Sequence, residues 1–250
     1  MEKDEYENMF NLEDFYWWFK GLRNLVFSSI KKFSGRGRIK LLDAGCGTGK
    51  FLESCKAYEA YGIDVSEEAI RFCRHRNMTN FKKASITDIP FDSNSFDVVT
   101  SMDVLSQRGI NNDLTALKEF YRVLNNNGTL ILNLPAFKFL RSTHDEVVHI
   151  RQRYDRIELN KKLDDVGFKI EIITYRNTIL FPLILLKRFA GKYFREKGEK
   201  VQSDLRPPPM LINSILTYIL FLENKLIDLG RNFPFGCSLY CIARKEITNV

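Results

Sequence analysis

The residues of this sequence whose types and spacing could do chemistry lie in one run, from Leu41 to Gly49. Within it an acidic residue, Asp43, is followed by glycines on three alternate positions, 45, 47 and 49. The apolar residues before the run indicate a short buried strand, and Phe51 to Cys55 indicate the start of a helix. Glycine lets a ligand approach bare backbone, and a helix N-terminus exposes N–H groups. The run therefore predicts a strand–turn–helix unit that binds a nucleotide-type ligand.

Three kinds of glycine turn compete for this run, and single residues decide among them. A phosphate loop requires a leading glycine and a final Ser or Thr that binds magnesium, but Ala44 and Phe51 stand there. A dinucleotide-binding turn requires a third glycine where Lys50 stands, which excludes close packing of helix on strand. The third kind, an acidic residue followed by glycines on alternate positions, fits at every place.

The run Leu42-Asp43-Ala44-Gly45-Cys46-Gly47-Thr48-Gly49 resembles the first motif of class I S-adenosylmethionine-dependent methyltransferases. Ahead of it, Trp17-Trp18-Phe19 resembles a segment found in the type 11/12-like subset of this family. The resemblance covers about residues 15–175 and the final strand. It implies S-adenosyl-L-methionine as cofactor and an α/β, Rossmann-like fold. That fold is a seven-stranded, mostly parallel sheet with an antiparallel last strand, here with a helical insertion before it.

We expect four parts along the chain. They are N-terminal cap helices over 1–38, the cofactor-binding core over 39–175, an apolar and basic helical insertion over 176–235, and the final strand of the core over 236–250. Apolar runs predict the strands of the core at 39–42, 60–63, 81–84, 95–101, 129–135 and 168–174.

The resemblance also implies roles for the cofactor-binding residues. Asp43 orders the turn, and the backbone of Gly45, Cys46, Gly47 and Gly49 admits the methionine end of the cofactor. Asp64, which closes the second strand, is expected to hold the ribose hydroxyls. Its alternative role is to cap the next helix, but Ser66 is the better cap.

Further residues follow from the same resemblance. Val65 is expected on the adenine face, and Ser85 and Ile86 at the adenine edge. The family commonly has an acidic residue where Ser85 stands, so this sequence departs there. Ser101 and Met102 are expected near the sulfonium end, because open α/β sheets bind ligands at the carboxyl ends of their strands.

The aromatic segment around Trp17 and Trp18, which contains both tryptophans of the chain, has two interpretations. It is a helix that anchors the N-terminus to the core, as aromatic side chains often do. Alternatively, it covers the cofactor, with Arg23 near the cofactor's carboxylate. The two roles are compatible.

The residues that bind the methyl acceptor are harder to identify from the sequence than those that bind the cofactor. The segment 137–154 holds two of the three histidines, and it resembles a segment with a His-Asp pair in the same subset. His144 is the candidate base, because a neutral imidazole can take a proton from a hydroxyl as the methyl arrives. Relatives often carry a histidine where Gln107 stands. The spacing of these residues predicts no metal site.

Composition limits the class of partner. The 250 residues carry a net charge of +7, concentrated in a few places, which does not indicate nucleic-acid binding. Five cysteines without metal-type or disulfide-type spacing, and an acidic N-terminus without a signal peptide, indicate a cytoplasmic protein. No apolar run was expected to approach the roughly 18 residues of a membrane span.

The insertion is nevertheless apolar in two stretches, 179–186 and 210–229, with a basic run between them. It is expected to form an added layer on the core or a homodimer contact. In a second interpretation, 179–229 makes peripheral contact with a membrane.

These observations predict a methyltransferase that acts on an oxygen of a small or lipid-linked metabolite, such as a sugar or a quinone-type ring. The alternatives are N-methylation of a small molecule, and a non-catalytic binding protein that retains the methyltransferase fold.

Overall fold

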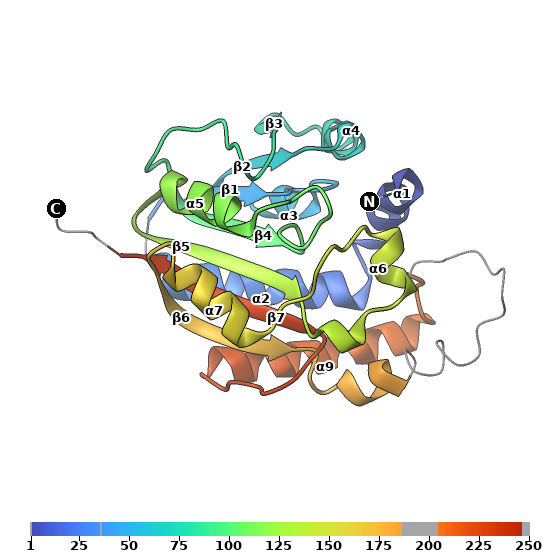
Figure 1. Ribbon diagram of the computed structural model, residues 1–250. Coiled ribbons are helices and arrows are strands. Elements are labelled where there is room, and N and C mark those ends of the chain that lie inside the picture. The colour runs from blue at the N-terminus through green and yellow to red at the C-terminus, as the bar shows by residue number, and fades with distance from the viewer. Residues whose placement is uncertain (1, 36, 187–204, 247–250) are drawn as a thin grey trace.

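A central sheet organises the chain in this computed structural model, which describes residues 2–35, 37–186 and 205–246. Seven strands lie in the order β3-β2-β1-β4-β5-β7-β6, and only β7 runs antiparallel to its neighbours (Figure 1). This confirms the predicted seven-stranded, mostly parallel sheet with an antiparallel last strand. The strands are β1 (Lys40–Ala44), β2 (Glu59–Asp64), β3 (Phe81–Lys83), β4 (Phe96–Met102), β5 (Leu124–Pro135), β6 (Phe168–Arg176) and β7 (Ser238–Lys245).

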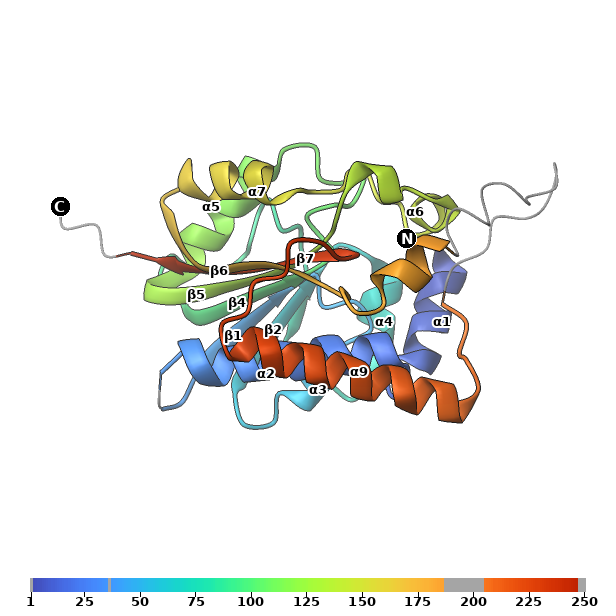
Figure 2. The same cartoon turned by 90° about the horizontal axis from the view of Figure 1, so that it is seen from below.

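The helices form a layer on each face of the sheet. Figure 2 shows α5 and α7 on one face, and α2, α3 and α9 on the other. Two further helices, α1 and α6, lie at the edge where β1, β4 and β5 end (Figure 1). The helices named are α1 (Lys3–Leu12), α2 (Trp17–Phe33), α3 (Lys50–Ser54), α4 (Glu67–His75), α5 (Asp113–Val123), α6 (Thr143–Val147), α7 (Arg156–Asp164) and α9 (Met210–Asp228).

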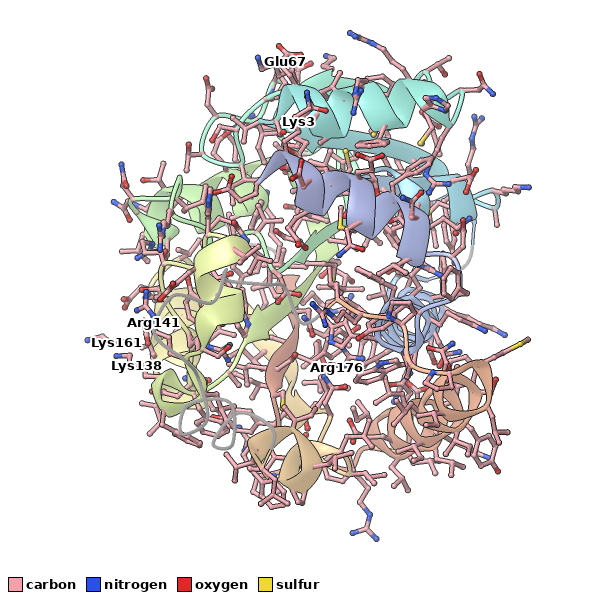
Figure 3. All side chains as sticks on the ribbon, turned by 90° about the vertical axis from the view of Figure 1, so that its right-hand side faces the viewer. Lys3, Glu67, Lys138, Arg141, Lys161 and Arg176 are labelled. Atoms are coloured by element: carbon pink, nitrogen blue, oxygen red, sulfur yellow. The ribbon has the colours of Figure 1, made fainter. Side chains whose placement is uncertain are left out.

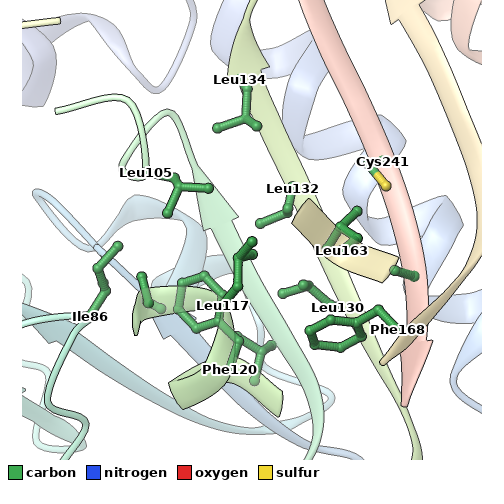
Figure 4. Packing of buried hydrophobic residues seen from close by; sticks show 14 of the residues in the cluster. Ile86, Leu105, Leu117, Phe120, Leu130, Leu132, Leu134, Leu163, Phe168 and Cys241 are labelled. Carbon is green, nitrogen blue, oxygen red and sulfur yellow. The ribbon is translucent and has the colours of Figure 1, made fainter. Parts of the chain in front are cut away.

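The core lies between the sheet and these layers. Leu117 and Phe120 of α5 pack on Leu130 and Leu132 of β5, and all four side chains are fully buried (Figure 4). The near-continuous apolar runs of β4 and β5 are explained by this packing, because a central parallel strand is covered on both faces. The core fixes the carboxyl ends of the strands, where polar side chains gather.

Helix α9, from the insertion, packs lengthwise against α2 (Figure 2). The contact is close because Gly21 of α2 has no side chain: a Cβ there would stand 2.4 Å from Cδ1 of Leu220. Nδ2 of Asn224 donates to the carbonyl of Gly21 at 2.8 Å. The insertion thus adds a helix to one layer of the core. The basic run that precedes α9 falls within 187–204, outside the described residues.

One expectation about the insertion needs amending. Helix α9 has 19 residues and a mean hydropathy of 1.4, so by length and composition it could cross a membrane, although no long apolar run was expected. Of its apolar stretch, 28% is buried inside the fold. One face of α9 packs against α2. The opposite face carries exposed apolar side chains and forms part of the surface of the protein.

Candidate active site

The glycine turn has the backbone that the sequence predicts. Gly45, Gly47 and Gly49 have φ of +97°, +53° and +84°, which L-residues with side chains rarely adopt. The N–H groups of Gly45 and Cys46 both donate to the carbonyl of Ile63, at 2.8 and 2.9 Å. The turn is therefore tied to β2, and it leads directly into α3.

Two carboxylates flank this turn. Asp43 is buried and accepts a hydrogen bond from Oγ1 of Thr100 at 2.8 Å. Burial, with a smaller effect of the nearby Asp64 carboxylate, raises the pKa of Asp43 to about 7. Asp64 accepts from the backbone N–H of Gly47 and of Ser66, both at 2.9 Å, and burial raises its pKa as well. Asp64 thus joins the turn to the start of α4.

The other residues predicted to bind the cofactor differ in their burial and in their hydrogen bonds. Val65 is 67% exposed beside Asp64, whereas Ile86 is buried in the core. The hydroxyl of Ser85 bonds to that of Thr87 at 2.8 Å. The hydroxyl of Ser101 is fully buried and donates to the carbonyl of Ala44 at 2.9 Å, so it braces β4 against β1. The side chains of Ile86 and Ser101 are therefore structural, and only the backbone of these residues is left for a ligand.

Helix α1, which falls within the segment 1–38 expected to form cap helices, lies over the turn. Figure 3 looks onto the carboxyl edge of the sheet and shows α1 crossing in front of it, between α4 and α2. Cε of Met9 lies 3.0 Å from the place where a Cβ on Gly47 would stand. Burial, with a smaller effect of the Asp64 carboxylate, raises the pKa of Tyr6 of α1 to about 12.

A buried ion pair between Glu13 and Arg76 fixes the C-terminal end of α1. Oε1 of Glu13 accepts from Oγ1 of Thr48 at 2.5 Å and from Nη2 of Arg76 at 2.7 Å. Burial raises the pKa of Glu13 despite these partners. Burial lowers the pKa of Arg23, and the charges of Glu13 and nearby acids oppose that effect. Acidic side chains of the protein itself, Glu13, Asp14 and Glu53, therefore act on the charge of Arg23.

The segment 137–154, expected at the acceptor side, forms α6 and the loop that follows. Asp145 and Arg153 are buried and make a bidentate ion pair, with both N–O distances 2.6 Å. Nε2 of His149 lies 2.8 Å from Oε1 of Glu2. The backbone of His144 belongs to α6, but its side chain lies outside the described residues. Asp145 thus serves the fold, and the role of His144 stays a prediction.

Three polar residues that the sequence analysis did not single out meet at the ends of β4, β5 and β6. Asp103 has a φ of +60° and is partly exposed. Both of its carboxylate oxygens accept from Nδ2 of Asn133, at 3.1 and 3.0 Å. Nη1 of Arg176 donates to Oδ1 of Asn133 over a long 3.5 Å. Burial raises the pKa of Asp103 to about 6, although Asn133 and the charge of Arg176 act against it.

The glycine turn and its neighbours fit S-adenosylmethionine. A Cβ on Gly45 would stand 2.1 Å from Cγ2 of Val104, so only glycine leaves the turn in this shape. Among the described residues, the groups that act on the pKa of Asp43 are Thr100 and Asp64 together with burial, and none of them is a Lys or Arg. An uncompensated carboxylate of this kind favours a cationic ligand. The cofactor carries a sulfonium and an ammonium group, and its ribose offers a hydroxyl pair to Asp64.

Comparison with known proteins agrees with this geometry. Residues 42–132, from the end of β1 into β5, match the family model described as a methyltransferase domain. An uncharacterized protein of Methanocaldococcus jannaschii is 28% identical over 238 residues, which span 92% of this chain and 93% of that protein. The demethylmenaquinone methyltransferase of Staphylococcus aureus is 35% identical over 124 residues, 44% of this chain. The chain spans about half the length of that enzyme, 51%.

Solved structures extend the likeness in fold to the whole chain. A SAM-dependent methyltransferase of Thermotoga maritima superposes with a TM-score of 0.59 and 19% identity, over 97% of this chain and 95% of that one. Together, the domain match and the fold confirm the prediction from the sequence. The chain carries a methyltransferase domain, within a fold that it shares with SAM-dependent methyltransferases.

Proposed function

We propose that this S-adenosylmethionine-dependent methyltransferase methylates a lipid-linked acceptor with a hydroxylated or quinone-type ring, and that it does so at a membrane surface. One observation carries the proposal, namely the exposed apolar face of α9. The demethylmenaquinone methyltransferase that resembles the core supplies the comparison for the ring. The cofactor contributes an electrophilic methyl group, and the protein must align the acceptor with it and exclude water.

The exposed face of α9 is large and continuous along the helix. Its most exposed large apolar side chains are Met210, Leu211 and Tyr218, between 64% and 87% exposed, and Leu229, directly after the helix, is 73% exposed. Leu183 and Leu186, before the basic run, are also exposed, at 63% and 68%. Surface apolar residues are usually scattered, so a stripe of this kind marks an interaction site.

The acidic residues of α9 are turned toward the body of the protein. Glu223 is fully buried, and its carboxylate accepts from three backbone N–H groups, those of residues 177, 178 and 179. Oδ2 of Asp228 accepts from the hydroxyl of Ser28 at 2.6 Å. The two acidic residues of α9 are thus both engaged with the body of the protein, and its outer face has no carboxylate.

Exposed cations border this face. Arg206 precedes α9, Lys225 lies on it and Arg231 follows it, all three exposed. The chain as a whole carries +7. An apolar helix face bordered by Lys and Arg is the pattern of helices that lie in the interface of anionic membranes. The charge therefore favours an anionic lipid surface as the occupant over a second copy of a protein with the same positive charge.

The orientation of α9 suits delivery of the acceptor to the carboxyl edge of the sheet. The amino-terminal end of α9 lies on the side of the molecule that holds α1 and α6 (Figure 2). This is also the edge where β1, β4 and β5 end, beside the glycine turn. A lipid-linked ring could enter this edge while its tail stays in the membrane.

Vesicle flotation tests the membrane contact. The wild-type chain should float with vesicles of phosphatidylglycerol and phosphatidylcholine at low salt, and less so with phosphatidylcholine alone. The double variant Leu211→Glu/Leu222→Glu should stay in solution. Ile157→Glu is the matched control, because Ile157 is 83% exposed on α7, on the other face of the sheet.

Absence of flotation by the wild type would overturn the membrane contact. So would a concentration-dependent dimer, seen by sedimentation, that the α9 variant abolishes, because the face would then join two copies. Transfer of a labelled methyl group from S-adenosylmethionine into the lipid extract of isolated membranes, rather than into the aqueous fraction, tests the acceptor.

A further inference from the structure

Arg176 is buried with most of its hydrogen-bonding capacity unused. Its side chain has no exposed surface, and within the described residues its Nε and Nη2 have no hydrogen-bond partner. A guanidinium offers five N–H donors in a fixed plane. Leaving such donors unpaired in the interior is costly, so they are expected to meet a ligand.

The surroundings of Arg176 place these donors at the edge where acceptors bind. Arg176 ends β6, which β7 separates from β5, and its side chain reaches Asn133 of β5. Figure 3 shows it between α6 on one side and α2 and α9 on the other. Its guanidinium carbon lies 5.9 Å from the ring centre of Trp18. A cation next to an aromatic ring, on the ligand-binding edge of an α/β sheet, is a suitable place for a planar ring.

Glu223 does not use these donors. Its Oε1 accepts from the N–H of Asn177 at 2.5 Å, and Oε2 accepts from Thr178 and Ile179 at 2.8 and 3.0 Å. Burial lowers the pKa of Arg176, and the charges of Glu223 and Asp103 oppose this effect. Glu223 therefore balances the charge of Arg176 and leaves its Nε and Nη2 without a hydrogen-bond partner among the described residues.

Asp103 supplies the complementary group. Asn133 bridges the two residues, since its amide donates to the Asp103 carboxylate and accepts from Arg176. The φ of +60° at Asp103 is a conformation that costs energy for a non-glycine residue, and such residues cluster at functional sites. Unlike Arg176, Asp103 is partly exposed, so an acceptor can reach it.

We propose that Asp103 and Arg176, bridged by Asn133, bind the acidic hydroxyl of a phenol-type or enol-type acceptor. The O–H proton passes to the Asp103 carboxylate, and the electron pair stays on the oxygen as an anion that the Nε–Nη2 edge of Arg176 holds. This oxygen would then form the new O–CH3 bond while the CH3–S bond of S-adenosylmethionine breaks, the sulfur keeps the bonding pair as S-adenosylhomocysteine leaves, and the proton stays on Asp103. The inference rests on the proposed function and names the acceptor group that this site takes.

Formal charge decides against an acceptor that arrives as an anion. Ionised Asp103 and Glu223 already outweigh Arg176, and the Asp145–Arg153 pair adds nothing. A carboxylate would bring one more negative charge into this site. A neutral hydroxyl leaves the total unchanged, because its proton neutralises Asp103 as the oxyanion forms.

The test uses 4-nitrophenol, whose anion is yellow, with S-adenosylhomocysteine present to occupy the cofactor site. In a buffer about one unit below the pKa of the free phenol, the wild type should bind the probe mainly as the anion. A charge-assisted hydrogen bond corresponds to a roughly tenfold or greater shift in the phenol–phenolate ratio. Arg176→Met should return the bound probe to the neutral form, and Arg176→Lys should retain part of the shift.

Two further measurements make the result decisive. Titration calorimetry in buffers of different ionisation enthalpy counts protons: Asp103→Asn should release more protons per bound phenolate than the wild type, with the difference approaching one proton as the pH rises above the pKa of Asp103, which is about 6. Arg176→Met should also melt no lower than the wild type, since a buried cation with unpaired donors is removed. Arg122→Met is the control for loss of an arginine, because Arg122 pairs with Glu119 away from this site.

A colourless probe on the wild type would overturn the proposal. So would an Arg176→Met variant that binds 4-nitrophenolate normally but loses S-adenosylmethionine, because Arg176 would then hold the carboxylate of the cofactor. Either result leaves vesicle flotation unaffected, so failure of this assignment can be told apart from failure of the proposed function.

Discussion

Gly45→Ala is the substitution whose cost can be worked out most fully from the structure. Gly45 has a φ of +97°, and its added Cβ would stand 2.1 and 2.9 Å from the two γ-carbons of Val104. The left-handed backbone costs a residue with a side chain about 1–2 kcal/mol. Forcing a methyl group into packed surroundings costs about 1–3 kcal/mol more. We expect a loss of roughly 3 kcal/mol in the free energy of unfolding, with much weaker binding of S-adenosylmethionine.

Urea unfolding of three variants separates the two costs. Gly230→Ala is the backbone control, because Gly230 has a φ of +88° and an added Cβ would meet nothing within 4 Å. Gly45→Ala should be the more destabilising of the two by the packing cost. Val104→Ala should relieve the contact, so the double variant Gly45→Ala/Val104→Ala should lose about 1–2 kcal/mol less than the sum of the single variants.

Additive losses in this cycle would refute the packing argument. A Gly45→Ala variant that unfolds as Gly230→Ala does, and binds S-adenosylmethionine like the wild type, would refute the assignment of the turn itself.

Two other predictions concern the carboxylates around the turn. Glu13→Gln should cost about 2–3 kcal/mol of stability, because Arg76 and Thr48 lose a buried ionised partner. Hydrogen exchange over residues 3–12 should accelerate in this variant but not in Glu7→Gln, an exposed position of the same helix; equal exchange in both would show that Glu13 does not hold α1. The raised pKa of Asp43 predicts that the free energy of unfolding depends on pH. Its pKa is raised to about 7, whereas an unfolded aspartate titrates near 3.9, so the unfolded state loses its proton first as the pH rises. Stability should therefore fall between about pH 4 and pH 7, by up to about 4 kcal/mol, and stay level above. Asp43→Asn should lack this component in urea unfolding, and parallel curves for the two proteins would contradict the raised pKa.

The sheet and the cofactor turn could be predicted because their signals are local. Alternate glycines after Asp43 dictate a turn, and short apolar runs dictate strands, with no need to know what packs on them. The observed ends of the strands differ from the predicted ends by only a few residues. For example, the first strand runs over Lys40–Ala44 instead of 39–42.

Other parts of the site depend on contacts between distant residues. Asp103, Asn133 and Arg176 are separated by 30 and 43 positions, and only the strand order brings them together. In the sequence, Arg176 stands where the insertion begins, and nothing nearby marks it as buried. The one available signal was that Asp103 directly follows a strand at the ligand-binding edge.

The contacts that helix α1 makes with the turn could not be predicted for a similar reason. Residues 1–14 are polar and acidic, so their composition gives no sign of a buried face. Its anchors are single contacts, such as Glu13 with Thr48 and Arg76, that exist only once the helix lies on the turn.

Calorimetric titration with S-adenosylmethionine, and separately with NAD, tests the central claim most directly. The account predicts that S-adenosylmethionine binds and NAD does not, and that Asp64→Ala weakens binding at least tenfold, or about 1.4 kcal/mol. Asp88→Ala, which changes an exposed carboxylate nearby, should bind like the wild type. Binding of NAD, or S-adenosylmethionine affinity that is indifferent to Asp64, would contradict the assignment of this turn as the methyl-donor site.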